Sequence, residues 1–92
     1  MDLKSKLTNY LDVQGRLKAW PSRRNRRQFQ RWALEYLIEK FKQDLLYSEK
    51  QVNEILNQHH TFGDPALLRR EMFERKLMNR TRDGAAYWRQ TQ

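Results

Sequence analysis

Apolar residues recur at helical spacing over much of this chain. The longest example runs from about Asn25 to Lys42, where apolar side chains follow one another three or four positions apart: Phe29, Trp32, Ala33, Tyr36, Leu37 and Phe41. This spacing predicts a helix that buries one face. Residues 3 to 11 predict a shorter N-terminal helix from the same spacing of Leu3, Leu7, Tyr10 and Leu11.

Two further helices are predicted by residues that cap helix N-termini. Ser48, followed three positions later by Gln51, has the pattern of a capping box. That helix ends near His59 and would bury Val52, Ile55 and Leu56. Asp64-Pro65 predicts the start of the next helix, because aspartate accepts from free backbone amides and proline fits the first turn. Its inward residues would be Leu67, Leu68 and Met72.

A short strand is predicted before the long helix. After the turn residue Gly15, apolar Leu17 and Ala19 alternate with charged residues, and Pro21 would end the extended run. We expect Trp20 to pack on the core.

The sequence Asp83-Gly84 predicts a β-hairpin, because this pair favours a two-residue turn between extended runs. Such a turn pairs Arg82 with Ala85, Thr81 with Ala86, and Arg80 with Tyr87. Strand alternation then gives the hairpin two sides. One side is mostly cationic and holds Met78, Arg80, Arg82, Tyr87 and Arg89. The other side would pack on the core and holds Leu77, Thr81, Ala86 and Trp88.

Together these elements predict an α+β fold, mostly α, of the winged helix-turn-helix type. Three to four helices precede a C-terminal β-hairpin, which would be the wing, and the helix from Asp64 to about Lys76 would be the recognition helix. A chain of 92 residues usually forms one domain, so we assign residues 1–92 to a single domain.

Three segments of the chain also resemble a known bacterial family. GRLKAWPSRRNRR, YSEKQVNEILNQHHTFGDPALLRRE and NRTRDGAAYW are similar to the domain of unknown function 2087, over about residues 12–89, with residues 1–11 outside. That domain occurs alone or beside helix-turn-helix domains of transcriptional regulators, so the resemblance implies a regulatory setting without an activity or ligand. Similar sequences tend to have glycine at the position of Lys76. Its absence here predicts a recognition helix that runs slightly longer or ends differently.

Basic residues outnumber acidic ones at both ends of the chain. The sequence holds 19 Lys and Arg against 11 Asp and Glu, a formal net charge of +8. Residues 1–33 hold 9 basic and 2 acidic side chains and residues 67–92 hold 7 and 3, whereas residues 34–66 hold 3 and 6. This balance favours an anionic partner, most commonly nucleic acid, and the two ends would form one positive face if they meet.

Composition also excludes several classes of protein. The chain has no cysteine, which excludes disulfides and thiolate metal sites and fits a reducing cytoplasm. No run approaches the ~20 apolar residues that cross a bilayer, and the N-terminus lacks the apolar core of a signal peptide. We therefore expect a soluble cytoplasmic protein that does not associate with membranes.

Catalytic and metal chemistry have little support in the sequence. No Gly-rich phosphate loop and no nucleophile with a nearby base stands out, so we expect no enzyme activity, cofactor or small-molecule substrate. His59 and His60 are adjacent, and neighbouring side chains on a helix point about 100° apart, which does not suit shared metal ligation. We interpret them as the end of a helix.

Three groups of residues are candidates for contact with nucleic acid. Arg69 and Arg70 lie on the predicted recognition helix, on the same side as Phe73. The run SRRNRRQ places cations where they oppose the dipole of a helix, which suggests an external anion, and contributes Arg23, Arg24, Arg26 and Arg27. The hairpin would contact phosphate or the minor groove through Arg80, Arg82, Tyr87 and Arg89.

Each group also has a plainer interpretation. Solvated charge clusters and arginines on edge strands are common, and Glu71 and Glu74 would repel phosphates from the recognition helix. Phe73 separates the two interpretations of that helix. An outward Phe73 would be a contact residue, and an inward one would belong to the core.

We expect a DNA-binding domain that takes part in transcriptional regulation, with duplex DNA as its partner. The alternative is an interaction or sensor module that packs against a transcriptional regulator or forms a homodimer. There the acidic helix from Ser48 to His59 and exposed aromatics such as Phe73 or Trp20 would matter more than the arginines. A third hypothesis is RNA binding through the basic hairpin.

Overall fold

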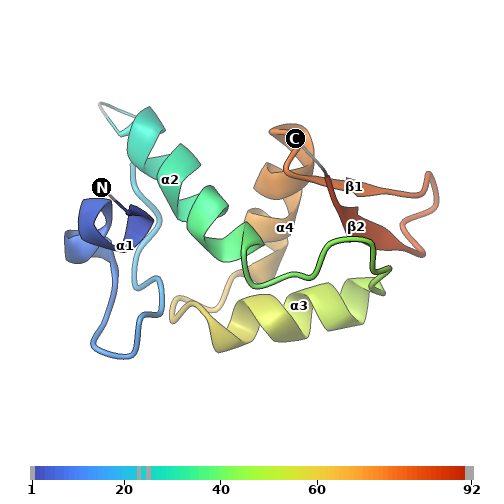
Figure 1. Ribbon diagram of the computed structural model, residues 1–92, viewed down its shortest axis with the longest axis horizontal. Coiled ribbons are helices and arrows are strands. Elements are labelled where there is room, and N and C mark those ends of the chain that lie inside the picture. Colours follow the sequence, from blue (N-terminus) through green and yellow to red (C-terminus); the bar gives the residue numbers. More distant parts are fainter. Residues whose placement is uncertain (1, 23, 25, 91–92) are drawn as a thin grey trace.

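In the part of the chain that the structure describes, four α-helices precede a two-stranded antiparallel hairpin (Figure 1). The computed structural model describes residues 2–22, 24 and 26–90. The elements in chain order are α1 (Leu3–Lys6), a 3-10 helix (Thr8–Tyr10), α2 (Arg27–Ile38), α3 (Glu49–Gln58), α4 (Pro65–Glu74), β1 (Met78–Arg80) and β2 (Tyr87–Arg89). This order confirms the predicted α+β, winged-helix-like class.

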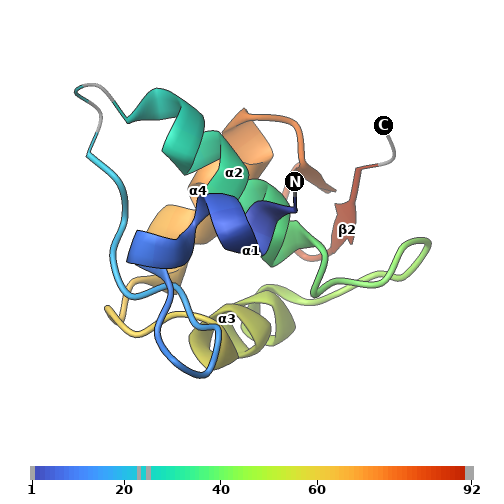
Figure 2. The same cartoon turned by 60° about the vertical axis from the view of Figure 1, so that its left-hand side comes forward.

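Helix α2 is shorter than predicted. It begins at Arg27 and ends at Ile38, and the predicted start at Asn25 lies outside the described residues. Its buried side consists of Gln30, Ala33, Leu34, Leu37 and Ile38. Two aromatic residues of the predicted stripe contact the N-terminal segment: Phe29 packs on Tyr10 of the 3-10 helix, and Lys6 of α1 lies over the Trp32 ring. Figure 2 shows α1 beside α2. Phe41 is buried beyond the helix end.

The strand predicted around Leu17 is wrong. Leu17 forms isolated bridges with Leu11 on one side and His60 on the other, so its partners lie in two different loops. Pairing therefore stops after one residue, although Leu17 itself is fully buried. Trp20 packs against the core as predicted.

The turn between α3 and α4 forms through the predicted caps. The Ser48 and Gln51 side chains form the complete capping box of α3, and His59 is its C-terminal cap. Asp64 Oδ1 accepts from the Leu67 amide at 3.1 Å and begins α4. His60 is buried between the two helices and uses both ring nitrogens. Its Nδ1 lies 2.6 Å from the Leu56 carbonyl, and its Nε2 accepts from the Asp64 amide at 2.9 Å.

Helix α4 ends at Glu74, so the expectation that it runs slightly longer or ends differently without glycine is wrong. Lys76 adopts the left-handed conformation with φ 64°. The Leu77 amide donates to the Met72 carbonyl at 2.9 Å and the Lys76 amide to the Phe73 carbonyl at 3.1 Å. These two bonds form a Schellman motif, which satisfies carbonyls that the last helical turn leaves free. Lysine thus occupies the conformation that glycine usually provides.

The hairpin has the predicted register but a different turn. Arg80 pairs with Tyr87, and the Thr81 amide donates to the Ala86 carbonyl at 2.9 Å. The Gly84 amide donates to the Thr81 carbonyl at 3.0 Å, so the turn spans Thr81–Gly84 and the predicted pairing of Arg82 with Ala85 is absent. A two-residue type I′ turn needs positive φ at both central residues. Here, among the described turn residues, only Gly84 has it, with φ 74°.

A third segment extends the hairpin sheet, and the sequence did not predict it. Tyr47, in the loop between α2 and α3, exchanges two backbone hydrogen bonds with Tyr87, at 2.8 and 2.7 Å. Strand β2 therefore lies between β1 and the Tyr47 bridge. This bridge links the loop after α2 to the hairpin through one residue pair.

The assignment of the hairpin's two sides is partly wrong. Met78 and Tyr87 are buried, at 1% and 4% exposed, and alternation places them on the same side as Arg80 and Arg89. This side packs on the core, while Trp88 on the other side is half-buried. Met78 and Tyr87 thus decide which side packs on the core, although Arg80 and Arg89 share that side. Within the described ranges, none of the helices combines the length and the apolar character needed to cross a membrane.

Candidate nucleic-acid interface

Helix α4 exposes a narrow stripe. Its exposed residues are Ala66, Arg70 and Glu74, spaced by four, and its buried residues are Leu68, Glu71 and Met72. Positions four apart share one side of a helix, so the stripe runs along the length of α4. The prediction that Arg70 faces outward is confirmed.

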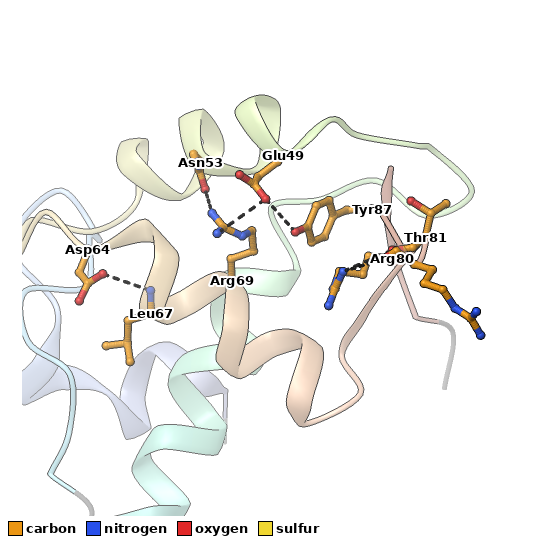
Figure 3. A network of polar contacts seen from close by, with 9 residues as sticks. Glu49, Asn53, Asp64, Leu67, Arg69, Arg80, Thr81 and Tyr87 are labelled. Atoms are coloured by element: carbon orange, nitrogen blue, oxygen red, sulfur yellow. Dashed lines mark hydrogen bonds and ion pairs between the residues drawn. The ribbon is translucent and has the colours of Figure 1, made fainter. Parts of the chain in front are cut away.

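Arg69 differs from its neighbour because its guanidinium is engaged within the protein. Its Nη1 donates to Asn53 Oδ1, and its Nη2 lies 3.8 Å from Glu49 Oε1 (Figure 3). The Arg69 side chain is 19% exposed. Both partners belong to α3, so Arg69 cross-links the two helices of the helix-turn-helix. Its guanidinium is therefore less available than that of Arg70 to an external anion.

Glu49 also holds the hairpin. The Tyr87 hydroxyl donates to Glu49 Oε1 at 3.1 Å, and Figure 3 shows Tyr87 and Arg69 pointing toward this carboxylate from β2 and α4. Burial, followed by the hydrogen bond with Glu49, raises the pKa of the Tyr87 hydroxyl. Tyr87 therefore joins the hairpin to α3.

Phe73 and Arg80 stack on each other. The Arg80 guanidinium lies 4.6 Å from the centre of the Phe73 ring, within the range of a cation–π contact. Phe73 is half-buried and does not belong to the core cluster or to the residues packed against it. The ring therefore supports a hairpin arginine beside α4.

Three adjoining hollows surround the exposed side of α4. The first, about 440 Å³, lies between α4 and the hairpin and is lined by Arg69, Arg70, Phe73, Arg80 and others. The second, about 700 Å³, shares Phe73 and Glu74 with it. The third, about 480 Å³, shares Glu74 and Arg75 with the second and reaches Arg27 at the start of α2. We call the surface that these hollows form around Ala66, Arg70 and Glu74 the α4 face.

The structure thus brings together parts of all three predicted arginine groups. Arg27 from the start of α2, Arg70 from α4 and Arg80 from the hairpin line the α4 face. Arg24, Arg26 and Arg82 are exposed next to these segments, and Arg23 lies outside the described residues. Within the described part of the chain, no hydrogen bond or ion pair engages the guanidinium groups of Arg24, Arg27, Arg70 and Arg82.

Arg89 lies elsewhere. Its Nη1 donates to the Phe41 carbonyl and its Nη2 to Glu39, both at 3.2 Å. Arg89 lines none of the three hollows of the α4 face, although the hollows that it does line share Arg31 and Gln90 with the second of them. Arg89 fixes β2 to the end of α2.

Sequence reasoning missed several residues that shape this surface. Arg75 donates from Nε to Glu71 at 3.0 Å and from Nη2 to Gln30 at 2.6 Å, which ties the end of α4 to α2. The four-residue spacing of Glu71 and Arg75 was a signal for this pair. The partnership of Glu49 with Arg69 and Tyr87 had no local signal, because it joins three separate elements.

The histidines offer no metal site. His60 uses both ring nitrogens within the turn, as described above. Burial, followed by the charge of Lys40, lowers the pKa of His59. Across residues 2–22, 24 and 26–90, no group of at least three histidine or acidic residues is placed to hold a metal ion.

Comparisons with known proteins give one match. A family model described as an uncharacterized protein conserved in bacteria (DUF2087) matches residues 16–89. No curated protein and no solved structure matches the chain. Because the family model covers most of the sequence, the chain belongs to this uncharacterised bacterial family, DUF2087.

Proposed function

We propose that this protein binds duplex DNA as a winged-helix domain without catalytic activity of its own and takes part in transcriptional regulation. Helix α4 would enter the major groove, and the hairpin and the start of α2 would contact the flanking phosphates. One observation carries the proposal. Arg27, Arg70 and Arg80 line the α4 face although they come from three separate parts of the chain, and the guanidinium groups of Arg27 and Arg70 have no partner among the described residues.

The charges on this surface suit a polyanion. Arginines with free donors bind phosphate oxygens in fixed directions, and each neutralised phosphate releases counterions. The net charge of +8 adds a long-range attraction. Arg80 needs little reorganisation before it binds, because Phe73 already supports its guanidinium.

The dimensions of α4 also suit a groove. Its 10 residues give a length of about 15 Å. The major groove is about 12 Å wide and admits one α-helix. We place this activity in the cytoplasm, where bacterial DNA lies.

Binding to a labelled random duplex, measured by fluorescence anisotropy over a series of salt concentrations, tests the proposal. If about six phosphates are neutralised, log K should fall with log salt at a slope of about −5. Replacing Arg82 with alanine should weaken binding and reduce the slope by about 1. The matched control is Lys18→Ala, because Lys18 is exposed and lines none of the three hollows. No binding even at low salt would overturn the proposal.

A second function, contact with another protein chain, is favoured by a different surface. Leu45 and Leu46 are 44% and 66% exposed and line a hollow of about 560 Å³ together with Trp88. Exposed apolar residues of this size often mark protein contacts.

Light scattering would reveal a homodimer. A pull-down repeated after nuclease treatment separates the two functions, because protein contacts survive the nuclease. Competition with structured RNA tests the RNA hypothesis.

A further inference from the structure

Glu74 occupies an unexpected place on the α4 face. It is exposed, and it lines all three adjoining hollows. Within the described residues it has no hydrogen-bond or ion-pair partner, not even Arg70 one turn earlier. The other acids that line these hollows are engaged: Glu49 with Arg69 and Tyr87, Glu71 with Arg75, and Asp83 with Thr81 and the Ala85 amide. Glu74 is thus the free carboxylate among the described residues lining this cationic surface.

A free carboxylate is unfavourable on a surface that contacts only phosphates. Like charges repel, and the repulsion grows when binding removes water from between them. In the major groove, however, a carboxylate has a favourable partner. The exocyclic amino group of cytosine is a hydrogen-bond donor that lies at the base edge, away from the phosphates. The position of Glu74 on the outermost line of α4 suits contact with base edges better than contact with the backbone.

The other two residues of the stripe also match base-edge chemistry. Arginine can donate two hydrogen bonds to guanine O6 and N7, and the methyl group of alanine can contact the thymine methyl group. The stripe from Ala66 to Glu74 extends about 12 Å along the helix axis. This length corresponds to three or four base pairs at about 3.4 Å per pair.

We propose that Glu74 and Arg70 are specificity-determining residues, with Glu74 accepting a hydrogen bond from cytosine and Arg70 donating to a guanine nearby. This inference rests on the proposed function and specifies its ligand as duplex DNA of defined sequence. It assigns the phosphate contacts to Arg24, Arg27, Arg80 and Arg82, and the base contacts to α4.

Selection from a randomised duplex library, followed by affinity measurements on the selected sequences, tests the inference. The wild-type protein should select a short site that contains guanine and cytosine. In Glu74→Gln, the preference for cytosine over the other bases at one position should fall about tenfold. The affinity for sites with adenine at that position should rise, because glutamine can form two hydrogen bonds with the adenine edge. In Arg70→Ala, the preference for guanine should be lost at a neighbouring position.

The matched control is Glu54→Gln, which removes the same charge from an exposed residue of α3 that lines none of these hollows. It should leave the selected site unchanged. Because Glu74 is exposed and has no partner among the described residues, Glu74→Gln should melt at the wild-type temperature, which a thermal unfolding curve verifies.

Three outcomes would overturn the inference, and they differ in what they say of DNA binding. If Glu74→Gln binds every duplex more tightly by the same factor, Glu74 acts only by repulsion. If the wild type binds duplex DNA without any sequence preference, the base-contact assignment fails while the proposed function stands. If the wild type does not bind DNA, both fail together.

Discussion

The hydroxyl of Tyr87 in β2 donates to the carboxylate of Glu49 in α3, at 3.1 Å. The same carboxylate oxygen lies 3.8 Å from Arg69 in α4. One acidic side chain therefore holds the hairpin, α3 and α4 together (Figure 3). Because α4 and the hairpin both line the α4 face, Glu49 helps to set the distance between them.

Removing the Tyr87 hydroxyl should weaken this connection. Tyr87→Phe should lower the free energy of unfolding by about 1 kcal/mol, because the hydrogen bond is lost while the ring stays buried. Urea unfolding measures the change. Tyr10→Phe is the matched control, since within the described residues the Tyr10 hydroxyl has no hydrogen-bond partner. Equal losses in the two variants would contradict this role of Tyr87.

Lys76 allows the cost of a left-handed backbone at the end of α4 to be measured. A side chain in the left-handed conformation costs about 1–2 kcal/mol, and glycine avoids this cost but gains freedom in the unfolded chain. Lys76→Gly should therefore have a free energy of unfolding about 0.5–1 kcal/mol higher than that of Lys76→Ala, which loses the same side-chain contacts.

Lys76→Ala serves as the comparison, because alanine keeps the Cβ atom that causes the strain. The two variants lose the same side-chain atoms beyond Cβ, so the difference between them measures the backbone conformation alone. If urea unfolding gives the same stability for both, the strain at this position has been overestimated.

The predictable parts of the fold share one property, which is that their signals are local. Ser48, Asp64 and the hairpin register depend on residues within a few positions of one another, and each was predicted. The Tyr47 bridge to Tyr87 joins segments 40 positions apart through a single residue pair, so no periodicity indicates it. The packing side of the hairpin depends on what lies beneath it, which strand alternation alone does not decide.

The candidate site shows the same limit. Exposure of Arg70 follows from the helical wheel, because it depends only on the positions of Leu68 and Met72. The helical wheel does not predict the internal pairing of Arg69, since its partners Glu49 and Asn53 lie on another helix. Glu74 was interpreted only as a source of repulsion, and its isolation becomes visible when the partners of the neighbouring acids are known.

His60 should contribute more to stability than its neighbour His59. His60→Ala removes the buried ring that joins the Leu56 carbonyl to the Asp64 amide, so the free energy of unfolding should fall by at least about 2 kcal/mol. His59→Ala is the neighbouring control and should cost less, because His59 is only half-buried. Denaturant unfolding of both variants measures the difference. A larger loss for His59→Ala would show that the turn is held in another way.

Arg69 and Arg70 are adjacent in sequence but should respond to substitution in opposite ways. Arg69→Ala removes the links to Asn53 and Glu49, so it should lower the free energy of unfolding by about 1–2 kcal/mol. Arg70→Ala removes an exposed side chain that has no partner among the described residues, so stability should change by less than about 0.5 kcal/mol.

DNA affinity should show the reverse pattern, with a loss of about tenfold or more for Arg70→Ala and a smaller loss for Arg69→Ala at a temperature where both are folded. Unfolding curves and anisotropy titrations on the same two preparations supply the comparison. A stable Arg69→Ala that loses all DNA binding would move the contact from Arg70 to Arg69 and show that its pairing with Glu49 opens when DNA binds.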